Sequence, residues 1–230
     1  YNETPPSEPE LFIQKERVIQ YCEELFIRQY KDKIIEADDG IAYYCSQIKE
    51  DEKIVIVTND RDMLQLIDER VGVYVINLKK IVTIDNYNQN FNHHYSNVML
   101  LKMLSGDNSD NIKGIKGVSE KTLLKYFPEF STKSLTLNDI FSKIESIQSE
   151  RKNRLKTLDN IKNKVTVGIQ GDDIFTINEK IINLKNPLLT ESSKEELDNL
   201  FCTPIDPEDR TTKNVIRMML EDGLTMAIPG

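Results

Sequence analysis

The stretch Leu104-Ser-Gly-Asp107-Asn-Ser-Asp110-Asn111-Ile-Lys-Gly114-Ile-Lys-Gly117-Val-Ser-Glu-Lys121-Thr122 joins a pair of carboxylates to a two-glycine turn. Asp107 and Asp110 lie three residues apart, and Gly114 and Gly117 follow shortly after them. Glycine has no Cβ, so this turn can take a positive φ and let another backbone approach closely. Ser119 is placed to cap a short amphipathic helix. The stretch therefore predicts a carboxylate group fused to a tight turn and a helix start.

The turn and the helix start form a candidate anion site, because backbone N–H groups in such positions can point toward a phosphate. Residues 113–125 carry four lysines and one glutamate, a net charge of 4 − 1 = +3. A plain helix–turn–helix joint explains the glycines equally well, whereas a nucleotide P-loop needs a different glycine–lysine spacing. The candidate phosphate-contacting residues of this stretch are Lys113, Gly114, Lys116, Gly117, Ser119, Lys121 and Thr122.

Two further acidic clusters precede this stretch. Glu36, Asp38 and Asp39 open a segment with helical periodicity. Asp60 and Asp62 follow an apolar, β-branched run that is typical of a buried parallel strand. Ligands of open α/β sheets gather beyond the carboxyl ends of such strands. The clusters are therefore predicted to meet at one edge of a sheet.

A meeting of the three clusters requires cations to offset the repulsion between carboxylates, and hard oxygen ligands suit Mg²⁺ or Mn²⁺. Acidic residues also complement helix dipoles, and such a cap is the simpler interpretation of any one cluster taken alone. Three clusters together favour a metal site. Its candidate catalytic residues are Asp38, Asp39, Asp60, Asp62, Asp107 and Asp110, and the candidate metal ligands are these six with Glu36.

At these residues the chain resembles the 5′-nuclease superfamily, which includes flap endonucleases, the 5′-nuclease domain of bacterial DNA polymerase I and phage 5′–3′ exonucleases. The resemblance covers roughly residues 8 to 130 and is looser beyond them. The motifs that carry it are, in order, Glu36-Ala-Asp38-Asp39, Val57-Thr-Asn-Asp60-Arg-Asp62-Met-Leu-Gln-Leu, Gly106-Asp107-Asn-Ser-Asp110-Asn111 and Gly114-Ile-Lys-Gly117-Val-Ser-Glu-Lys121-Thr122.

The resemblance implies a two-metal active site for phosphodiester hydrolysis, with the seven acidic residues as ligands or as partners of ligands. It also implies a helix–three-turn–helix motif at residues 114–121 that grips duplex DNA, commonly with a K⁺ ion at the hairpin. Lys15 and Arg17 would lie at the base of a helical arch, near the scissile phosphate. Charges on a solvated helix are the simpler interpretation of these two residues.

The chain departs from the family pattern upstream of Glu36. Family members carry two further aspartates there, and no residue between Tyr1 and Lys33 fits those roles. We expect the chain to begin inside or just after the arch and to lack about half of the ligands of one ion. One alternative is therefore a non-catalytic DNA-junction-binding protein with an incomplete active site. An RNA-cleaving PIN-type domain is a third candidate, which the glycine turn disfavours.

The composition bounds the kind of protein. With 230 residues, 39% of them hydrophobic and 30% charged, the chain can bury one good core with an appended helical part. The net charge of −8 opposes nucleic-acid binding, yet residues 150–164 carry a net 6 − 2 = +4 that could follow a DNA backbone or form a solvated helix face. Three scattered cysteines and no apolar run of membrane length predict a reducing cytoplasm. A compact chain without a fused polymerase pattern favours a bacterial or phage-infected cell.

The predicted fold class is α/β, with a parallel-sheet, PIN-like nuclease core in residues 1–105 and a helical part in residues 106–230 that contains the helix–three-turn–helix motif. His93 and His94 lie in an Asn-rich segment and are expected in a surface turn with no catalytic role. Strands are predicted at residues 54–58 and 71–77, and helices at 11–29, 36–50, 62–68, 95–105, from 137 onward, 150–164, 193–201 and 207–222.

The resemblance implies a structure-specific 5′-nuclease that acts in replication or repair, including primer removal. Its expected partner is DNA with a 5′ flap, a nick or a 5′ end, and the sequence leaves open whether RNA–DNA hybrids also serve. A monomer without membrane association is expected. The segment after Leu189 is a candidate docking site for a replication protein.

Overall fold

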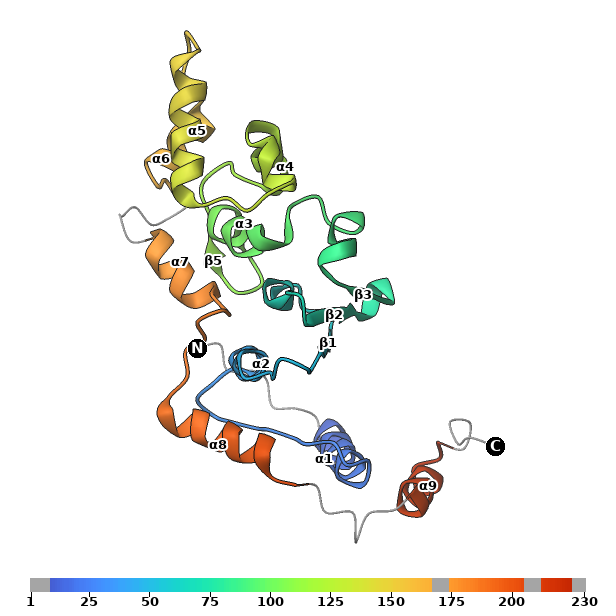
Figure 1. Ribbon diagram of the computed structural model, residues 1–230. Coiled ribbons are helices and arrows are strands. Elements are labelled where there is room, and N and C mark those ends of the chain that lie inside the picture. The colour runs from blue at the N-terminus through green and yellow to red at the C-terminus, as the bar shows by residue number, and fades with distance from the viewer. Residues whose placement is uncertain (1–8, 167–173, 205–211, 225–230) are drawn as a thin grey trace. The chain divides into compact units, whose positions relative to one another are not determined.

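The computed structural model describes residues 9–166, 174–204 and 212–224. The chain divides into two compact units, one of residues 1–37 and 189–230 and one of residues 38–188 (Figure 1). The α/β class is confirmed, since the second unit combines strands with helices. The boundary predicted between residues 105 and 106 stays a prediction. No helix in the described part of the chain has both the length and the apolar character needed to cross a membrane.

A three-stranded mixed sheet lies in the second unit. Its strands, in sheet order, are β1 (Ile54–Thr58), β2 (Val71–Val75) and β3 (Lys80–Val82). β1 pairs with β2 in parallel, as predicted, whereas β3 pairs with β2 antiparallel. The chain reverses through the short turn η2 (Ile76–Leu78) and through Lys79, whose φ of 51° is left-handed. So short a connection permits only an antiparallel neighbour, and the predicted parallel sheet is wrong for β3.

Strand β1 is less buried than its apolar sequence predicted. Ile56 is buried, while Val55 and Val57 are 49% and 64% exposed. Side chains alternate between the two faces of a strand, so one face of β1 packs inward and the other is open. Within the described residues β1 is an edge strand, and the expectation of burial on both faces is wrong.

One hydrophobic cluster packs on this sheet. It draws Ala42 from α2 (Ala37–Ser46), Met63 and Leu64 from η1 (Asp62–Leu66), and Tyr87 from η3 (Ile84–Gln89). These side chains are nearly inaccessible to solvent. The helices predicted after the first two acidic clusters are therefore present, and both bury apolar side chains against the strands.

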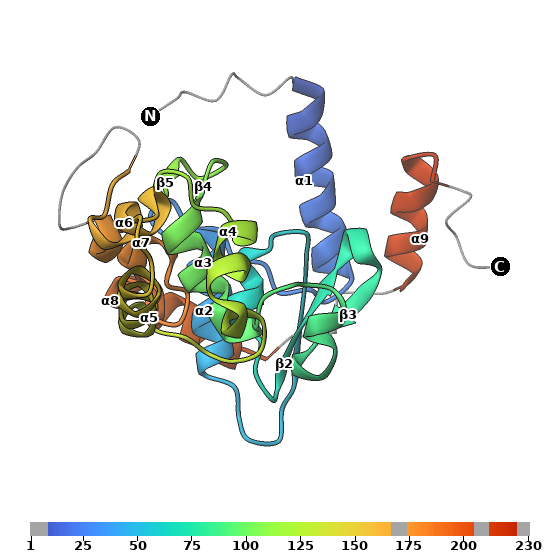
Figure 2. The same ribbon diagram turned by 90° about the horizontal axis from the view of Figure 1, so that it is seen from above.

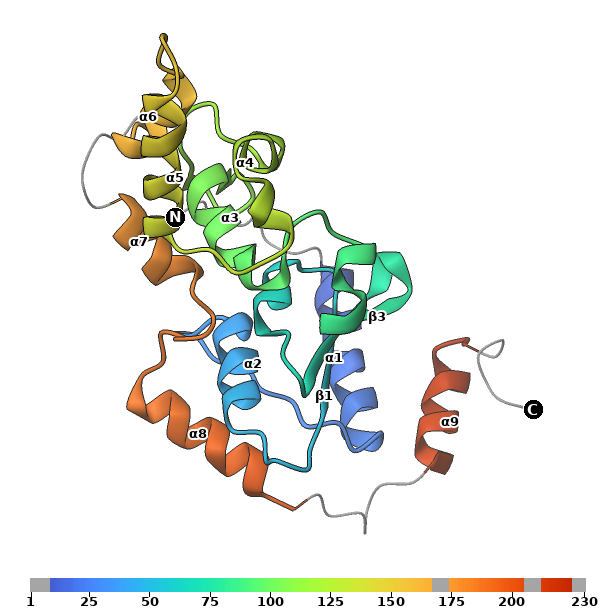
Figure 3. The same cartoon turned by 45° about the horizontal axis from the view of Figure 1, so that its top comes forward.

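A second cluster surrounds helix α3 (Val98–Ser105), which follows the single turn η4 (Tyr95–Asn97). Val98 belongs to the first cluster, whereas Met103 and Leu104 belong to the second, so α3 joins the two. In Figure 3, α3 lies between the strands and the helices α5 and α7. The other elements of this cluster are α4 (Glu120–Tyr126), η5 (Pro128–Ser131), α5 (Leu137–Ser149), α6 (Lys156–Lys162) and α7 (Ile174–Ile182).

A tight hairpin follows α3, formed by β4 (Gly106–Asp107) and β5 (Ile112–Lys113). The backbone of Gly114 lies directly against the end of α3, and a Cβ on Gly114 would stand 2.1 Å from the carbonyl carbon of Ser105. No side chain can be accommodated at that separation. Gly106 and Gly117 have φ values of 75° and 80°, a conformation that glycine adopts without a steric penalty. The close contact thus requires glycine at position 114, and the left-handed backbone favours it at positions 106 and 117.

Helix α5 begins where the sequence predicted, because Thr136 and Asp139 form a reciprocal capping box. The helix predicted over residues 150–164 is shorter, as α6 begins only at Lys156. The buried side chain of Gln148 bonds both the N–H (3.0 Å) and the carbonyl oxygen (3.2 Å) of Leu155. This pairing holds a turn between α5 and α6 in place of a continuous helix.

Helix α7 was not predicted from the sequence. It holds the β4–β5 hairpin against the second hydrophobic cluster. The buried side-chain amide of Asn178 donates to the carbonyl oxygens of Met103 (3.3 Å) and Lys113 (3.0 Å). Ile174, Phe175 and Ile182 lie on the same buried face. The polar Asn178 in the middle of that face obscures its helical periodicity in the sequence.

The first unit contains α1 (Pro9–Glu24), α8 (Glu191–Cys202) and α9 (Thr212–Glu221). Figure 2 shows α1 and α9 side by side, and Arg17 of α1 pairs with Glu221 and Asp222, each at 2.8 Å. α1 ends five residues before the predicted limit, because Phe26 takes a left-handed conformation (φ 60°). α8 lies within two residues of its predicted bounds, and α9 ends one residue before its predicted end. The predicted start of that last helix, over residues 207–211, lies outside the described residues.

Replacing Asn97 by Ala tests the support of α3. The fully buried amide of Asn97 donates to the carbonyl oxygens of Phe130 (2.9 Å) and Lys133 (2.8 Å) and accepts the N–H of Leu135 (2.9 Å). The carbonyl oxygen of Lys133 and the N–H of Leu135 lose this partner, while the carbonyl oxygen of Phe130 still accepts the N–H of His94 (2.9 Å). Urea unfolding should therefore show a loss of about 3 kcal/mol. An Ala at Asn163, which is exposed, is the control and should cost less than about 0.5 kcal/mol. Equal losses in both variants would contradict this role.

Replacing Gly114 by Ala tests the backbone contact with α3. A Cβ there overlaps the backbone of Ser105, so we expect a loss of at least about 3 kcal/mol in the free energy of unfolding. The matched variant Gly117→Ala meets open space, its nearest neighbour being Thr157 at 3.8 Å, and only its left-handed backbone costs about 1 kcal/mol. Thermal or urea unfolding of the two variants should rank them in that order.

Candidate functional site: an acidic cleft at the end of the sheet

A cleft of about 670 Å³ opens beside the carboxyl end of β1 in the second unit. Four aspartates contribute to its wall, together with Lys102, His93, Glu120 and four asparagines. The aspartates are Asp60, Asp62, Asp107 and Asp110. Two of the three acidic clusters predicted from the sequence therefore share one cleft.

Three of these carboxylates converge. Asp62, Asp107 and Asp110 each offer an oxygen atom, and the three atoms lie within 4.8 Å of one another. Asp62 begins η1 after the first strand, while Asp107 and Asp110 belong to the hairpin after α3. Segments that are 45 residues apart in the chain thus meet through the packing of α3 against η1.

Local hydrogen bonds fix the directions of these carboxylates. The Thr58 hydroxyl accepts the N–H of Asp60 (2.9 Å), and the Asp60 carboxylate accepts the N–H of Asp62 (2.8 Å). Asp107 likewise accepts the N–H of Ser109 (2.8 Å) and its hydroxyl. Turns closed by Asp and Thr side chains in this way hold the next polar residue in a defined orientation.

Lys102 of α3 lies among the three converging aspartates, and it was not predicted from the sequence. Its ammonium pairs with Asp62, with Asp107 at 2.8 Å and with Asp110 at 3.1 Å. The lysine side chain is only 13% exposed. A single lysine in the otherwise apolar run Val98–Leu104, one turn before the acidic hairpin, is the signal that could have identified it.

The pairing shifts the ionisation of these groups. Burial acts to raise the pKa of Asp107, but hydrogen bonds from Lys102 and Ser109 outweigh it and hold that pKa at about 2. For Asp62 burial prevails over the bond to Lys102, and the pKa is raised. Burial acts to lower the pKa of Lys102, and its bonds to Asp107 and Asp62 reverse that effect and raise it. Lys102 therefore stays charged.

The remaining acidic candidates lie outside this convergent group. Asp60 lines the same cleft and bonds the backbone of Asp62. Asp39, in the first turn of α2, accepts the N–H of Leu188 at 3.2 Å, and burial raises its pKa. Asp38 is half-buried on the same turn, and Glu36 is exposed in the first unit. Their roles as metal ligands stay predictions.

The predicted phosphate turn presents lysines more than backbone amides. The N–H groups of Ile115, Lys116 and Val118 already bond the carbonyl oxygens of Leu104, Val165 and Ile115 at 2.8, 2.8 and 3.0 Å. Ser119 caps α4 by accepting the N–H of Thr122 at 3.4 Å. The charged groups exposed around the turn are the side chains of Lys113, Lys116, Lys121 and Lys125.

Lys15 and Arg17 both lie on α1 in the first unit. Lys15 is exposed. Arg17 bonds Glu221 and Asp222, chiefly through hydrogen bonds to the Asp222 carboxylate that raise the pKa of the guanidinium. A contact between Arg17 and DNA stays a prediction, and it requires these ion pairs to open.

His93 is not in a surface turn, and that expectation is wrong. The ring is 6% exposed, with Nδ1 2.8 Å from the Glu120 carboxylate and Nε2 2.9 Å from the Tyr87 hydroxyl. Burial raises the pKa of Tyr87, so this hydroxyl keeps its proton. With a neutral ring, Tyr87 donates to Nε2 and Nδ1 donates to Glu120. The two hydrogen bonds of His93 thus connect η3 to the start of α4 in the wall of the cleft.

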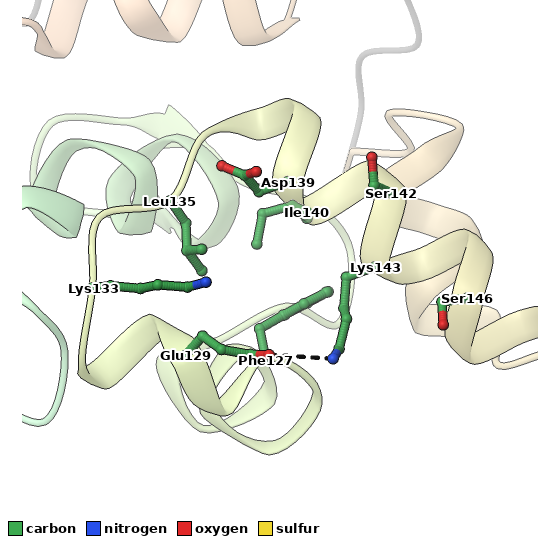
Figure 4. Close-up of a pocket in the computed structure, with 9 residues that line it drawn as sticks. All are labelled: Phe127, Glu129, Lys133, Leu135, Asp139, Ile140, Ser142, Lys143 and Ser146. Atoms are coloured by element: carbon green, nitrogen blue, oxygen red, sulfur yellow. Dashed lines mark hydrogen bonds and ion pairs between the residues drawn. The ribbon is translucent and has the colours of Figure 1, made fainter.

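A second hollow, of about 310 Å³, lies between η5 and α5 (Figure 4). Phe127 and Ile140 form its apolar part, and Glu129 pairs with Lys143 across it at 3.2 Å. Its other charged lining residues are Lys133 and Asp139. This hollow has no convergent group of carboxylates, so the acidic cleft is the stronger candidate for chemistry.

Comparisons with known proteins agree with this geometry. A family model described as "5′-3′ exonuclease, N-terminal resolvase-like domain" matches residues 1–98. The 5′-3′ exonuclease of Mycoplasmopsis pulmonis is 39% identical over 112 residues, 48% of this chain and 36% of the relative. That of Halalkalibacterium halodurans is 28% identical over 203 residues, 86% of this chain and 62% of the relative. Over these segments the chain is similar to 5′-3′ exonucleases. It spans less than two thirds of the length of either relative.

Solved structures show a similar fold. A mutant of the bacteriophage T5 5′-exonuclease aligns with a TM-score of 0.59 at 17% identity, over 90% of this chain and 76% of the T5 chain. A T5 5′-exonuclease structure with bound divalent zinc ions also has a TM-score of 0.59 at 17% identity, over 94% of this chain and 73% of the other. At this identity the likeness establishes the fold.

The donor set of the cleft suits a hard divalent cation. Carboxylate oxygens are the ligands that Mg²⁺ and Mn²⁺ prefer, and Asp62, Asp107 and Asp110 place three of them together. The Lys102 ammonium lies among them, which shows that the cluster accommodates a positive charge. The residues present therefore fit such an ion.

The lowered pKa of Asp107 gives a stability change at acid pH in the metal-free protein. Its folded pKa of about 2 lies below its ordinary 3.8, so its contribution is complete above pH 3.8 and is lost as the pH falls toward 2. The free energy of unfolding, measured in urea, should decrease between pH 4 and pH 2.5. In Asp107→Asn this decrease should be about 1 kcal/mol smaller than in the wild type. The exposed Asp51→Asn is the control, and an equal effect there would contradict the assignment.

Proposed function

We propose that the chain forms part of a divalent-metal-dependent, structure-specific 5′-nuclease that hydrolyses phosphodiester bonds in DNA. The observation that carries the proposal is the convergence of Asp62, Asp107 and Asp110 in a cleft next to a lysine-rimmed hairpin. The hairpin also supplies two of the three carboxylates. A group that binds a DNA backbone and a group that binds cations are therefore one structural unit.

The metal part of the proposal starts from this cluster. Asp62, Asp107 and Asp110 would hold a Mg²⁺ or Mn²⁺ ion, and Asp60 lies near enough in sequence and in the cleft to take part. Asp38, Asp39 and Glu36 are the proposed contributors to a second ion. When bound, such ions stabilise the negative charge that develops on a phosphate during hydrolysis and promote ionisation of water.

The protein's own groups would orient the substrate. Lys113, Lys116 and Lys121 are exposed around the glycine turn, where their charges can meet successive phosphates of a duplex. We assign the helix–three-turn–helix role to the segment from α3 to α4. The same proposal places a K⁺ ion at its turn, which contains Gly114, Gly117, Ser119 and Thr122. Since several turn amides bond protein carbonyls, lysine side chains carry most of this contact.

The proposed substrates are DNA 5′ flaps, nicks and 5′ ends, which arise in replication, repair and primer removal. A T5 flap endonuclease has been solved as a complex with DNA and metal ions, which supports a DNA substrate for this fold. RNA–DNA hybrids are included as substrates to be compared. A cytoplasmic, monomeric protein with a replication partner at its C-terminal segment completes the proposal.

Cleavage of a labelled 5′-flap DNA with Mg²⁺ tests the function. Changing both Asp107 and Asp110 to Asn removes two cation ligands while preserving size, so the cleavage rate should fall at least about 100-fold. Asp51→Asn, an exposed position away from the cleft, is the matched control and should cleave at the wild-type rate. Gel-shift affinity for the flap should change little, because the hairpin lysines are retained.

Two results would go against this assignment. An unaltered rate in the Asp107→Asn, Asp110→Asn variant would remove these residues from the chemistry. A wild-type chain that binds the flap and never cleaves it, with or without Mn²⁺, would support instead a DNA-junction-binding protein with an incomplete site.

A further inference from the structure

Lys102 is held more firmly than an ordinary surface lysine. Its ammonium contacts three carboxylates, its side chain is 13% exposed, and its stem emerges from the middle of the apolar helix α3. Surface ion pairs are usually single and exposed, as in the pair between Lys143 and Glu129, whose side chains are 45% and 39% exposed. The position of Lys102 is therefore set by the carboxylate cluster.

The ammonium takes the place that a cation ligated by the same cluster requires. Asp62, Asp107 and Asp110 present their oxygen atoms within 4.8 Å of one another, and the ammonium bonds one oxygen of each residue. A divalent ion bound by these three groups sits about 2.0–2.6 Å from its ligand oxygens, so an ammonium cannot remain in hydrogen-bond contact with the same set. Lysine and metal exclude each other there.

We propose that Lys102 is a built-in counter-cation that holds the acidic cluster together without metal and that a divalent ion must displace to bind. This inference rests on the proposed cation site and adds the residue that sets its affinity. Removing the ammonium abolishes a competitor and leaves three carboxylates that repel one another until an ion enters. Both effects strengthen metal binding. Lys102 acts through the ligands and is a positioning residue.

Calorimetric titration with Mn²⁺ tests the competition directly. Lys102→Met keeps the length of the side chain and removes its charge, so the dissociation constant for Mn²⁺ should fall about tenfold from that of the wild type. Lys143→Met removes the same charge at a pair outside the cleft and should leave that constant unchanged. The Lys102→Met protein should also gain more in unfolding temperature on addition of Mn²⁺ than the wild type does.

A measurement on the unaltered protein guards against a variant that fails to fold. Acetylation of lysines by a water-soluble reagent, followed by peptide mass spectrometry, reports how accessible each amine is. In EDTA, Lys102 should react several-fold more slowly than Lys143, since it is far less exposed. Saturating Mn²⁺ should speed the labelling of Lys102 and leave that of Lys143 unchanged.

The outcomes separate the inference from the function on which it rests. Equal or weaker Mn²⁺ binding by Lys102→Met, or labelling of Lys102 that ignores the metal, overturns the competition while the nuclease assignment stands. Absence of Mn²⁺ binding in both the wild type and Lys102→Met overturns the cation site and the inference together. Tighter binding by Lys102→Met, with the control unchanged, supports both.

Discussion

The contact between Gly114 and the end of α3 is the constraint on which the site depends. A Cβ at this position would overlap the backbone of Ser105, so the hairpin closes only because residue 114 is glycine. That closure sets Asp107 and Asp110 against the face of α3 that carries Lys102. Without it, the two aspartates are ordinary loop residues and the cleft loses half of its acidic wall.

Much of this arrangement could be predicted because its signals are local. The spacing of Asp107, Asp110 and the glycines, and the placement of Asp60 and Asp62 after a β-branched run, each depend on a few neighbouring residues. Capping is equally local, and α5 begins at its predicted residue because Thr136 and Asp139 are three positions apart. The convergence of Asp62 with Asp107 depends instead on the packing of α3 against η1.

What the sequence did not reveal depends on contacts between distant segments. Lys102 is a lysine on an apolar helix until Asp62, 40 residues away, is brought beside it. His93 lies in an Asn-rich stretch that suggests exposure, yet it is buried because Tyr87 and Glu120 satisfy both ring nitrogens. The apolar pattern of the buried face of α7 is interrupted by Asn178, whose hydrogen-bond partners lie 65 and 75 residues away. Pairings of this range have no local pattern.

The two hydrophobic clusters meet at the acidic cleft, and this gives the cleft a mechanical consequence. Asp62 is anchored beside Met63 and Leu64 of the sheet cluster, whereas Asp107 is anchored beside Ile112 of the helical cluster. Any cation shared by these carboxylates, whether an ammonium or a metal ion, acts as a cross-link between the two clusters. The binding free energy of such a cation therefore stabilises the packed arrangement of the two clusters, because a ligand stabilises the state that it binds. The acidic cleft thus stabilises the packing of the two clusters and is also the candidate functional site.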